Sequence, residues 1–167
     1  MLVFLICIVI LALIFDFING FHDAANSIAT IVSTKVLPPF QAVVWAAAFN
    51  FLAFFIFKEH KVAGTIANII SENIINFKVL LAATIAAISW NLLTWYYGIP
   101  SSSSHTLIGG LAGAAIAADG FSGVNTHPIY IALAFMVLSP IIGLIFGFLM
   151  TVITVNLAKK SRPANAD

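Results

Sequence analysis

The chain has 167 residues, of which 62% are hydrophobic and only 8% are charged, and its mean hydropathy is +1.09. A soluble domain carries about a quarter charged residues, so this composition excludes a water-soluble globule and indicates a surface that faces lipid. The net charge of +1, with no basic stripe, gives no argument for a nucleic-acid partner. The single cysteine, Cys7, cannot form an intrachain disulfide.

The first membrane helix is predicted to be broken. Residues 2–15 are apolar, but a helix needs about 20 such residues to cross the hydrocarbon. A polar stretch from Asp16 to Asn26 follows before apolar character resumes toward Thr34. The start of the chain lacks a basic region, so we interpret it as a retained transmembrane helix and not as a signal peptide.

The rest of the chain predicts an all-α, polytopic transmembrane helical bundle. After a turn at Pro38 and Pro39, the segments expected in chain order are a second crossing at 41–57, an interfacial helix at 62–77, a third crossing at 78–97, a short helix at 107–118, a loop at 119–128 and a last crossing at 129–157, tilted or bent at Pro140. Residues 1–158 are expected to form the transmembrane domain and 159–167 a basic tail. The positive residues of that tail place the C-terminus in the cytoplasm of a cell-membrane protein.

A polar stripe marks the first candidate site. Its members are spaced four, three, four and three apart and share one face of a continuous helix: Asn19, Asp23, Asn26, Thr30 and Ser33. A carboxylate in a membrane span is tolerated where it faces protein, water or an ion, and such oxygens suit Na⁺ or a proton. The stripe therefore predicts a cation site of Asp23, Asn26, Asn19 and Thr30. Bonding between membrane helices and capping of a helix at Asp23 remain alternatives.

A serine-rich segment marks the second candidate site. Ser101, Ser102, Ser103, Ser104 and Thr106 follow Pro100 at the start of the short helix. Helix N-termini attract anions, and hydroxyls add donors without adding charge. We expect these residues, together with Asn26, to bind phosphate. A serine N-cap in a surface loop would look similar. His105 and Asn91 are weaker candidates for support, whereas His22 is not expected to share a metal with Asp23. No catalytic residue or bound metal is expected.

At these residues the sequence resembles the Pit family of inorganic phosphate transporters. The stretch 19–30 is similar to the family's Gly-x-x-Asp-x-Ala-Asn motif, and 41–51, 90–109 and 139–144 also resemble the family. The resemblance implies an inverted-repeat transporter of two halves in opposite membrane orientation. Each half contributes a polar broken helix and a serine-rich re-entrant segment to a central phosphate site, where Asp23, Asn26, Ser101 to Ser104 and Thr106 match.

The expected function is phosphate transport by cation-coupled symport without a cofactor or enzymatic chemistry. The resemblance implies protons or Na⁺ as coupling ions, and in some members phosphate carried as a metal complex. Family members are more than twice this length, so a second transporter half or an antiparallel homodimer is the expected partner, besides membrane lipid. The alternatives are an inactive or regulatory half, and an intramembrane hydrolase using Ser104, His105 and Asp23.

Overall fold

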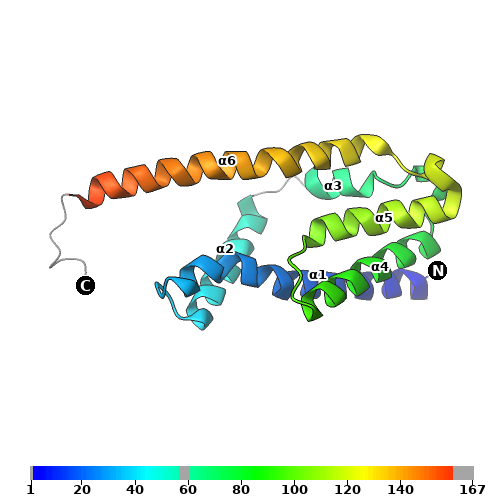
Figure 1. Cartoon of the computed structure of the whole chain (residues 1–167). Helices are drawn as coiled ribbons and strands as arrows, with labels where there is room; N and C mark the ends of the chain where they lie inside the picture. The colour runs from blue at the N-terminus through cyan, green and yellow to red at the C-terminus, as the bar shows by residue number, and fades with distance from the viewer. Residues whose placement is uncertain (1, 57–60, 160–167) are drawn as a thin grey trace. The chain divides into compact units, whose positions relative to one another are not determined.

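The computed structural model describes residues 2–56 and 61–159, and helices account for most of this part of the chain. The elements in order are α1 (Leu2–Ser33), α2 (Pro39–Ile56), α3 (Lys61–Ala67), a 3₁₀ turn η1 (Glu72–Ile74), α4 (Phe77–Tyr96), α5 (Ser103–Asp119), a second turn η2 (Gly120–Gly123) and α6 (Thr126–Ala158) (Figure 1). Strand structure within the described ranges is limited to one isolated bridge between Ile70 and Val124. The all-α prediction is confirmed.

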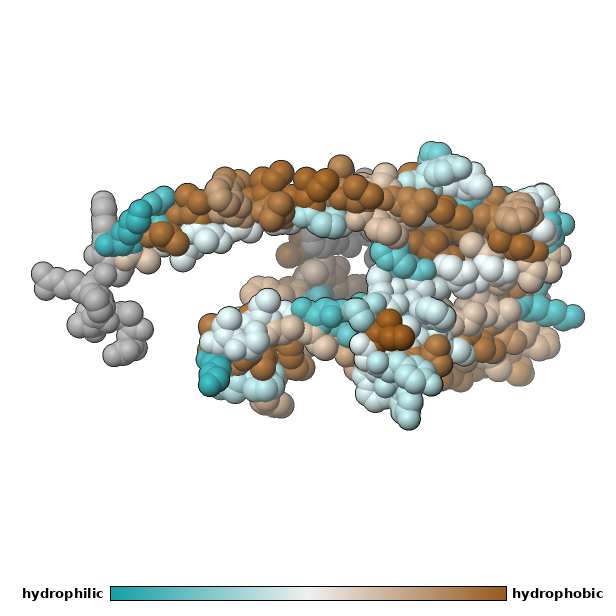
Figure 2. Space-filling model, viewed as in Figure 1, coloured by the Kyte–Doolittle hydropathy of each residue, from teal (hydrophilic) through white to brown (hydrophobic). Residues whose placement is uncertain are grey.

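Four helices are long and apolar enough to cross a membrane within the described residues: α1, α2, α4 and α6. Most of their large apolar side chains are exposed, and hydrophobic residues cover much of the visible face in Figure 2. A surface of this kind is stable only where lipid or further protein replaces water. The chain is therefore a multi-pass membrane protein, as predicted.

The prediction that the first helix is broken is wrong, because α1 is one continuous helix of 32 residues. Gly20 lies inside it, and a helical glycine is only about 1 kcal/mol less favourable than alanine, too little to interrupt so apolar a helix. The polar side chains do not begin a new helix either. The hydroxyl of Ser27 donates to the carbonyl of Asp23 one turn earlier, and the Asp23 carboxylate faces another helix.

Two other boundaries differ from the expectation. The interfacial helix predicted at 62–77 is helical only in α3 and in η1. The short helix begins at Ser103 instead of residue 107, so that α5 has 17 residues and a length of about 25 Å. The helix α6 continues through Pro140, which has no N–H to donate to the Met136 carbonyl, an interruption that membrane helices tolerate.

The helices α4 and α5 form an antiparallel hairpin (Figure 1). The buried residues of α4 recur every three or four positions and so form one face: Val79, Ala83, Ala87, Asn91 and Thr94. Small residues on this face allow close approach. A Cβ atom at Gly110 of α5 would lie 2.7 Å from the carbonyl oxygen of Ala83, so only glycine fits there.

The helix α1 packs along α4 in the parallel direction. The rings of Phe4 and Phe77 lie 4.7 Å apart near the two N-termini, and those of Phe21 and Trp95 lie 5.4 Å apart near the end of α4. Because α1 continues to Ser33, it extends beyond the tip of the α4–α5 hairpin by about 15 Å at 1.5 Å per residue. The tip of the hairpin therefore lies beside the middle part of α1 and not beside its end.

The base of the hairpin is joined by backbone hydrogen bonds to the segment that precedes α4. The amide of Ser71 donates to the Gly123 carbonyl at 3.0 Å, and the amide of Asn125 donates to the Ile69 carbonyl at 2.8 Å. Asn76 caps the start of α4, because its Oδ1 accepts from the Val79 amide at 3.1 Å. These contacts hold the hairpin at the end opposite to the serine-rich segment.

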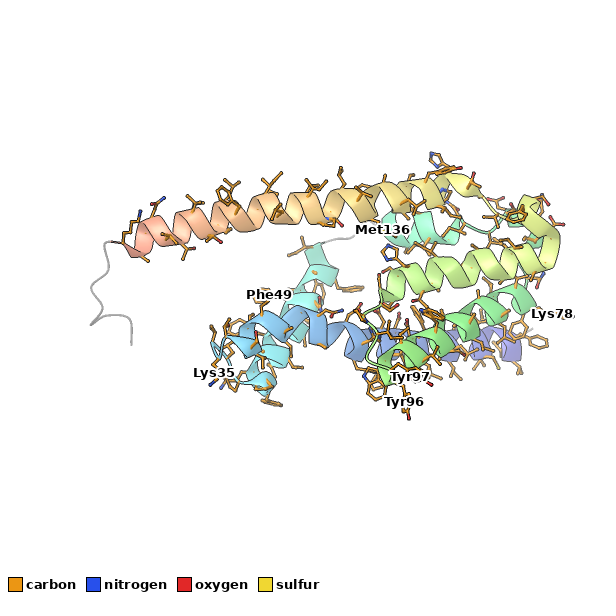
Figure 3. All side chains as sticks on the ribbon, viewed as in Figure 1. Lys35, Phe49, Lys78, Tyr96, Tyr97 and Met136 are labelled. Atoms are coloured by element: carbon orange, nitrogen blue, oxygen red, sulfur yellow. The ribbon has the colours of Figure 1, made fainter. Side chains whose placement is uncertain are left out.

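Residues 1–128 and 129–167 form two compact units. In the second unit, α6 is an apolar helix whose side chains are mostly exposed, including Met136 (Figure 3). In the first unit, Lys78 lies at the start of α4, and Tyr96 and Tyr97 lie at its other end (Figure 3). The basic tail predicted at 159–167 lies outside the described residues except for Lys159, and the end of the second crossing at residue 57 also lies outside them.

Candidate functional site

Ser103 connects the serine-rich segment to the polar stripe of α1. Its hydroxyl donates to Oδ2 of Asp23 at 2.8 Å and also contacts Oδ1 of Asn19. Ser103 is buried, with only 1% of its surface exposed, whereas Asn19 and Asp23 are partly buried and the Asp23 side chain is 47% exposed. The cluster therefore joins α1 to α5 and remains open to its surroundings on the Asp23 side.

Three oxygen atoms converge in this cluster, and one proton cannot satisfy all of them. A hydroxyl donates a single hydrogen bond, so Ser103 cannot donate to Asp23 and Asn19 at once. The Asn19 amide can turn to present its nitrogen to Ser103, because the two orientations of an amide are nearly equivalent in shape. A hard cation is the other group that a carboxylate, an amide and a hydroxyl oxygen hold together.

Local sequence explains how these side chains meet. Asn19 and Asp23 are four residues apart, so they lie one above the other on α1. Ser103 is the first residue of α5, and Ser102 before it caps the helix by accepting from the His105 amide at 3.5 Å. The N-terminus of α5, where backbone N–H groups remain free of intrahelical partners, therefore lies beside the polar part of α1.

The remaining residues of the serine-rich segment lie in two different environments. Ser101 and Thr106 line a cavity of about 400 Å³ between α4 and α5, and their hydroxyl oxygens lie 3.4 Å apart. His105 and Trp90 line the same cavity. Ser102 and Ser104 are exposed. The structure thus places Ser101 and Thr106 together, and Ser103 with the residues predicted to bind a cation.

The structure does not bring the distal part of the stripe into the cluster. Asn26, Thr30 and Ser33 are exposed on the continuation of α1 beyond the hairpin tip. The hydroxyl of Ser33 donates to the Thr30 carbonyl at 3.1 Å, within α1 itself. Roles for Asn26 and Thr30 in cation or phosphate binding stay predictions.

Two buried polar residues lie between α1 and α4. His22 is 8% exposed, with Nε2 3.5 Å from the Thr94 hydroxyl and Nδ1 3.7 Å from Oδ1 of Asp23. Asn91, expected to support the serine loop, is fully buried. Sequence reasoning gave His22 little weight, although a histidine beside an aspartate in an apolar helix is itself a signal of a buried polar contact.

The geometry gives no support to the hydrolase alternative. Asp23 is bonded to Ser103 and not to Ser104, and His105 lies on the cavity between α4 and α5. Among the described residues, no group of three His, Cys, Asp or Glu side chains is arranged to hold a metal ion.

Comparisons with known proteins identify relatives with named functions. The model of the phosphate transporter family matches residues 19–166. A protein of Rhizobium meliloti named a probable low-affinity inorganic phosphate transporter is 47% identical over 163 residues, covering 98% of this chain and 49% of that protein. A Bacillus subtilis protein of the same name is 47% identical, covering 100% of this chain and 50% of that protein. The chain spans about half the length of these relatives.

Two further similarities agree with these. The low-affinity inorganic phosphate transporter PitA of Escherichia coli is 35% identical, covering 81% of this chain and 30% of that protein. A solved structure described as the sodium-dependent phosphate transporter has a TM-score of 0.79 and 30% sequence identity, and it covers 90% of this chain and 39% of that chain. These relatives are transporters, in agreement with the expectation that the chain is not an enzyme. The chain therefore belongs to the phosphate transporter family.

Proposed function

We propose that this chain forms one half of a transporter that moves inorganic phosphate across a cell membrane together with a cation. The observation that carries the proposal is the bond between Ser103 and Asp23, because it connects the helix predicted to bind the anion with the helix predicted to bind the cation. A connection of this kind is what coupling requires, since each ion must affect the affinity for the other.

Asn19, Asp23 and Ser103 form the cation end of the proposed site. They supply amide, carboxylate and hydroxyl oxygens, the ligands that hard cations prefer. The similarity to a sodium-dependent transporter supports Na⁺ as the coupling ion. A proton on Asp23 is the alternative, and Asn26 and Thr30 would join the site only if α1 changes its surroundings during transport.

Ser101, Thr106 and the N-terminus of α5 form the anion end. Free N–H groups and hydroxyls donate to phosphate oxygens without adding net charge, so the anion can be bound and later released. Ser102 and Ser104 are exposed beside them and are available to donate as well. His105 lines the same cavity and is placed to donate to phosphate. A cation at Asp23 offsets the phosphate charge, which favours joint entry of the two ions.

The second half of the site is proposed to come from another polypeptide segment, because the chain spans about half of its relatives. That segment is either a related half in the opposite orientation or a second copy of this chain. An inactive or regulatory half is the competing function. We place the C-terminus in the cytoplasm and leave phosphate carried as a metal complex as a variant of the same cargo.

Uptake of labelled phosphate into liposomes tests the proposal. The chain is reconstituted in two preparations: alone, and together with the second half of a close relative. We call the second preparation the reconstituted transporter. We expect uptake driven by an inward Na⁺ or proton gradient in the reconstituted transporter. Uptake by the chain alone would support a homodimer. A complete lack of uptake in both preparations, with folded protein present, would contradict the proposal and favour the regulatory half.

A further inference from the structure

Asn91 is a fully buried amide that takes part in none of the hydrogen bonds of the candidate site. None of its side chain is exposed, and neither Oδ1 nor Nδ2 has a hydrogen-bond partner within the described residues. A buried amide without partners is strongly disfavoured, so each such group calls for an explanation. A group bound beside Asn91 would supply the missing partner of this amide.

Asn91 lies in the seam where three helices meet. It belongs to the buried face of α4, which packs against α1 and α5. One turn before it, Ala87 approaches Gly110 of α5, and three residues after it, Thr94 contacts His22 of α1. Asn91 is therefore enclosed by the same two helices that carry Asp23 and Ser103.

The register of the helices places Asn91 at the level of the three-oxygen cluster. Phe4 is paired with Phe77 and His22 with Thr94, which are offsets of 73 and 72 positions between α1 and α4. With these offsets Asn91 lies level with Ile18 and Asn19. The antiparallel packing of Gly110 against Ala83 and Ala87 brings the same level of α4 to the first turn of α5, where Ser103 lies.

We propose that the amide of Asn91 is a further ligand of an alkali cation bound by Asn19, Asp23 and Ser103. The inference rests on the proposed function and adds a residue of α4 to a site otherwise shared by α1 and α5. The amide oxygen adds a neutral ligand, so it helps to replace the water around Na⁺ without adding a second negative charge in the membrane. It also explains why an apolar helix face contains an amide.

The test replaces Asn91 with leucine in the reconstituted transporter. Leucine has the same branched skeleton of heavy atoms but is bulkier, and it removes both polar atoms, so replacing a merely unpaired amide would leave the Na⁺ dependence of uptake unchanged even if packing changes. If Asn91 is a ligand, the Na⁺ concentration for half-maximal phosphate uptake rises about tenfold, the lower range for loss of a bond to a charged group. The rise in melting temperature on adding NaCl, relative to KCl, is also lost.

Thr84→Val is the matched control on the same helix. The Thr84 hydroxyl lies two turns before Asn91 and donates to the Leu80 carbonyl within α4, so this variant removes a polar group that already has a partner in its own helix. We expect its Na⁺ dependence to be unchanged. If Asn91→Leu does not fold, Asn91→Asp keeps an oxygen at the position and is expected to retain the NaCl-specific rise in melting temperature.

Unchanged Na⁺ dependence in Asn91→Leu, or loss of the NaCl effect in Asn91→Asp, would overturn the inference. Phosphate uptake that runs on protons with no Na⁺ effect would also overturn it, while leaving phosphate transport intact. If the wild-type preparation moves no phosphate, the proposed function fails. The NaCl-specific change in melting temperature then still decides whether Asn91 contributes to a cation site.

Discussion

The hydroxyl of Ser103 donates to Oδ2 of Asp23 at 2.8 Å, and so joins two residues that are 80 positions apart in the chain. The contact lies where the tip of the α4–α5 hairpin meets α1. A carboxylate in a membrane helix is unfavourable unless it has such a partner. The same contact holds the serine-rich helix against α1, and so it joins the two helices to which the two ion sites are assigned.

Replacement of Asp23 is expected to abolish most transport. Asp23→Asn keeps the size of the side chain but removes the negative charge that attracts the cation. Because bonds to charged groups contribute about 1.5–3 kcal/mol, we expect phosphate uptake at limiting Na⁺ to fall at least tenfold. The measurement is the initial rate of labelled phosphate uptake by the reconstituted transporter. Asp119→Asn, at the far end of α5, is the charge-matched control, and equal rates in both variants would argue against a role for Asp23.

Ser103 and Thr106 are expected to affect different ions. Ser103→Ala removes a ligand of the proposed cation site and should raise the Na⁺ concentration for half-maximal uptake. Thr106→Val removes a hydroxyl from the cavity. It should instead raise the phosphate concentration for half-maximal uptake, by about three- to tenfold for the loss of one neutral hydrogen bond. Both constants are measured by varying one ion at saturating levels of the other. Ser122→Ala, in the connection after α5, is the control. A shift in the same constant for both variants would contradict this division.

Gly110 is expected to be essential for close packing of the hairpin. A Cβ atom there would lie 2.7 Å from the Ala83 carbonyl oxygen, so Gly110→Ala forces α5 away from α4. Overpacking of this kind destabilises by about 1–3 kcal/mol, and we expect a lower melting temperature in detergent. Gly113→Ala is the matched control, because nothing lies within 4 Å of its Cβ position and alanine favours a helix. Equal melting temperatures would show that the hairpin is loosely packed.

Asn76 is expected to stabilise the start of α4. Asn76→Ala leaves the Val79 amide without its side-chain acceptor, and loss of an N-cap destabilises by about 0.5–2 kcal/mol. The free energy of unfolding in detergent should fall by this amount while both ion constants stay at the wild-type values. The exposed Asn73, in η1, provides the comparison through Asn73→Ala. A change in Na⁺ or phosphate dependence would mean that the base of the hairpin is coupled to the site.

The proposed cytoplasmic location of the C-terminus can be tested by labelling. Cys7 is the single cysteine, so Lys159→Cys in a Cys7→Ser background carries one reactive thiol. We expect a membrane-impermeant maleimide to label it only after the cells are permeabilised, since positive residues near membrane helices remain inside. Labelling in intact cells would reverse the orientation.

The sequence by itself determined the class of this protein. Its few charges and its long apolar segments exclude a water-soluble protein. The helical, multi-pass architecture therefore follows from the composition and the lengths of these segments. The spacing of Asn19 and Asp23 also placed their side chains on one helix face. These features depend on local periodicity, which sequence records directly.

Only the tertiary structure decided which helix each polar group meets. The continuity of α1 through Gly20 and Asp23 could not be predicted, because partners on another helix compensate for polar side chains that would otherwise favour a break. Sequence likewise could not show that Ser101 and Thr106 line the cavity while Ser103 contacts Asp23. That difference depends on how α5 is rotated against α1 and α4. Contacts between residues 80 positions apart are set by helix packing, and helix packing is a property of the whole fold.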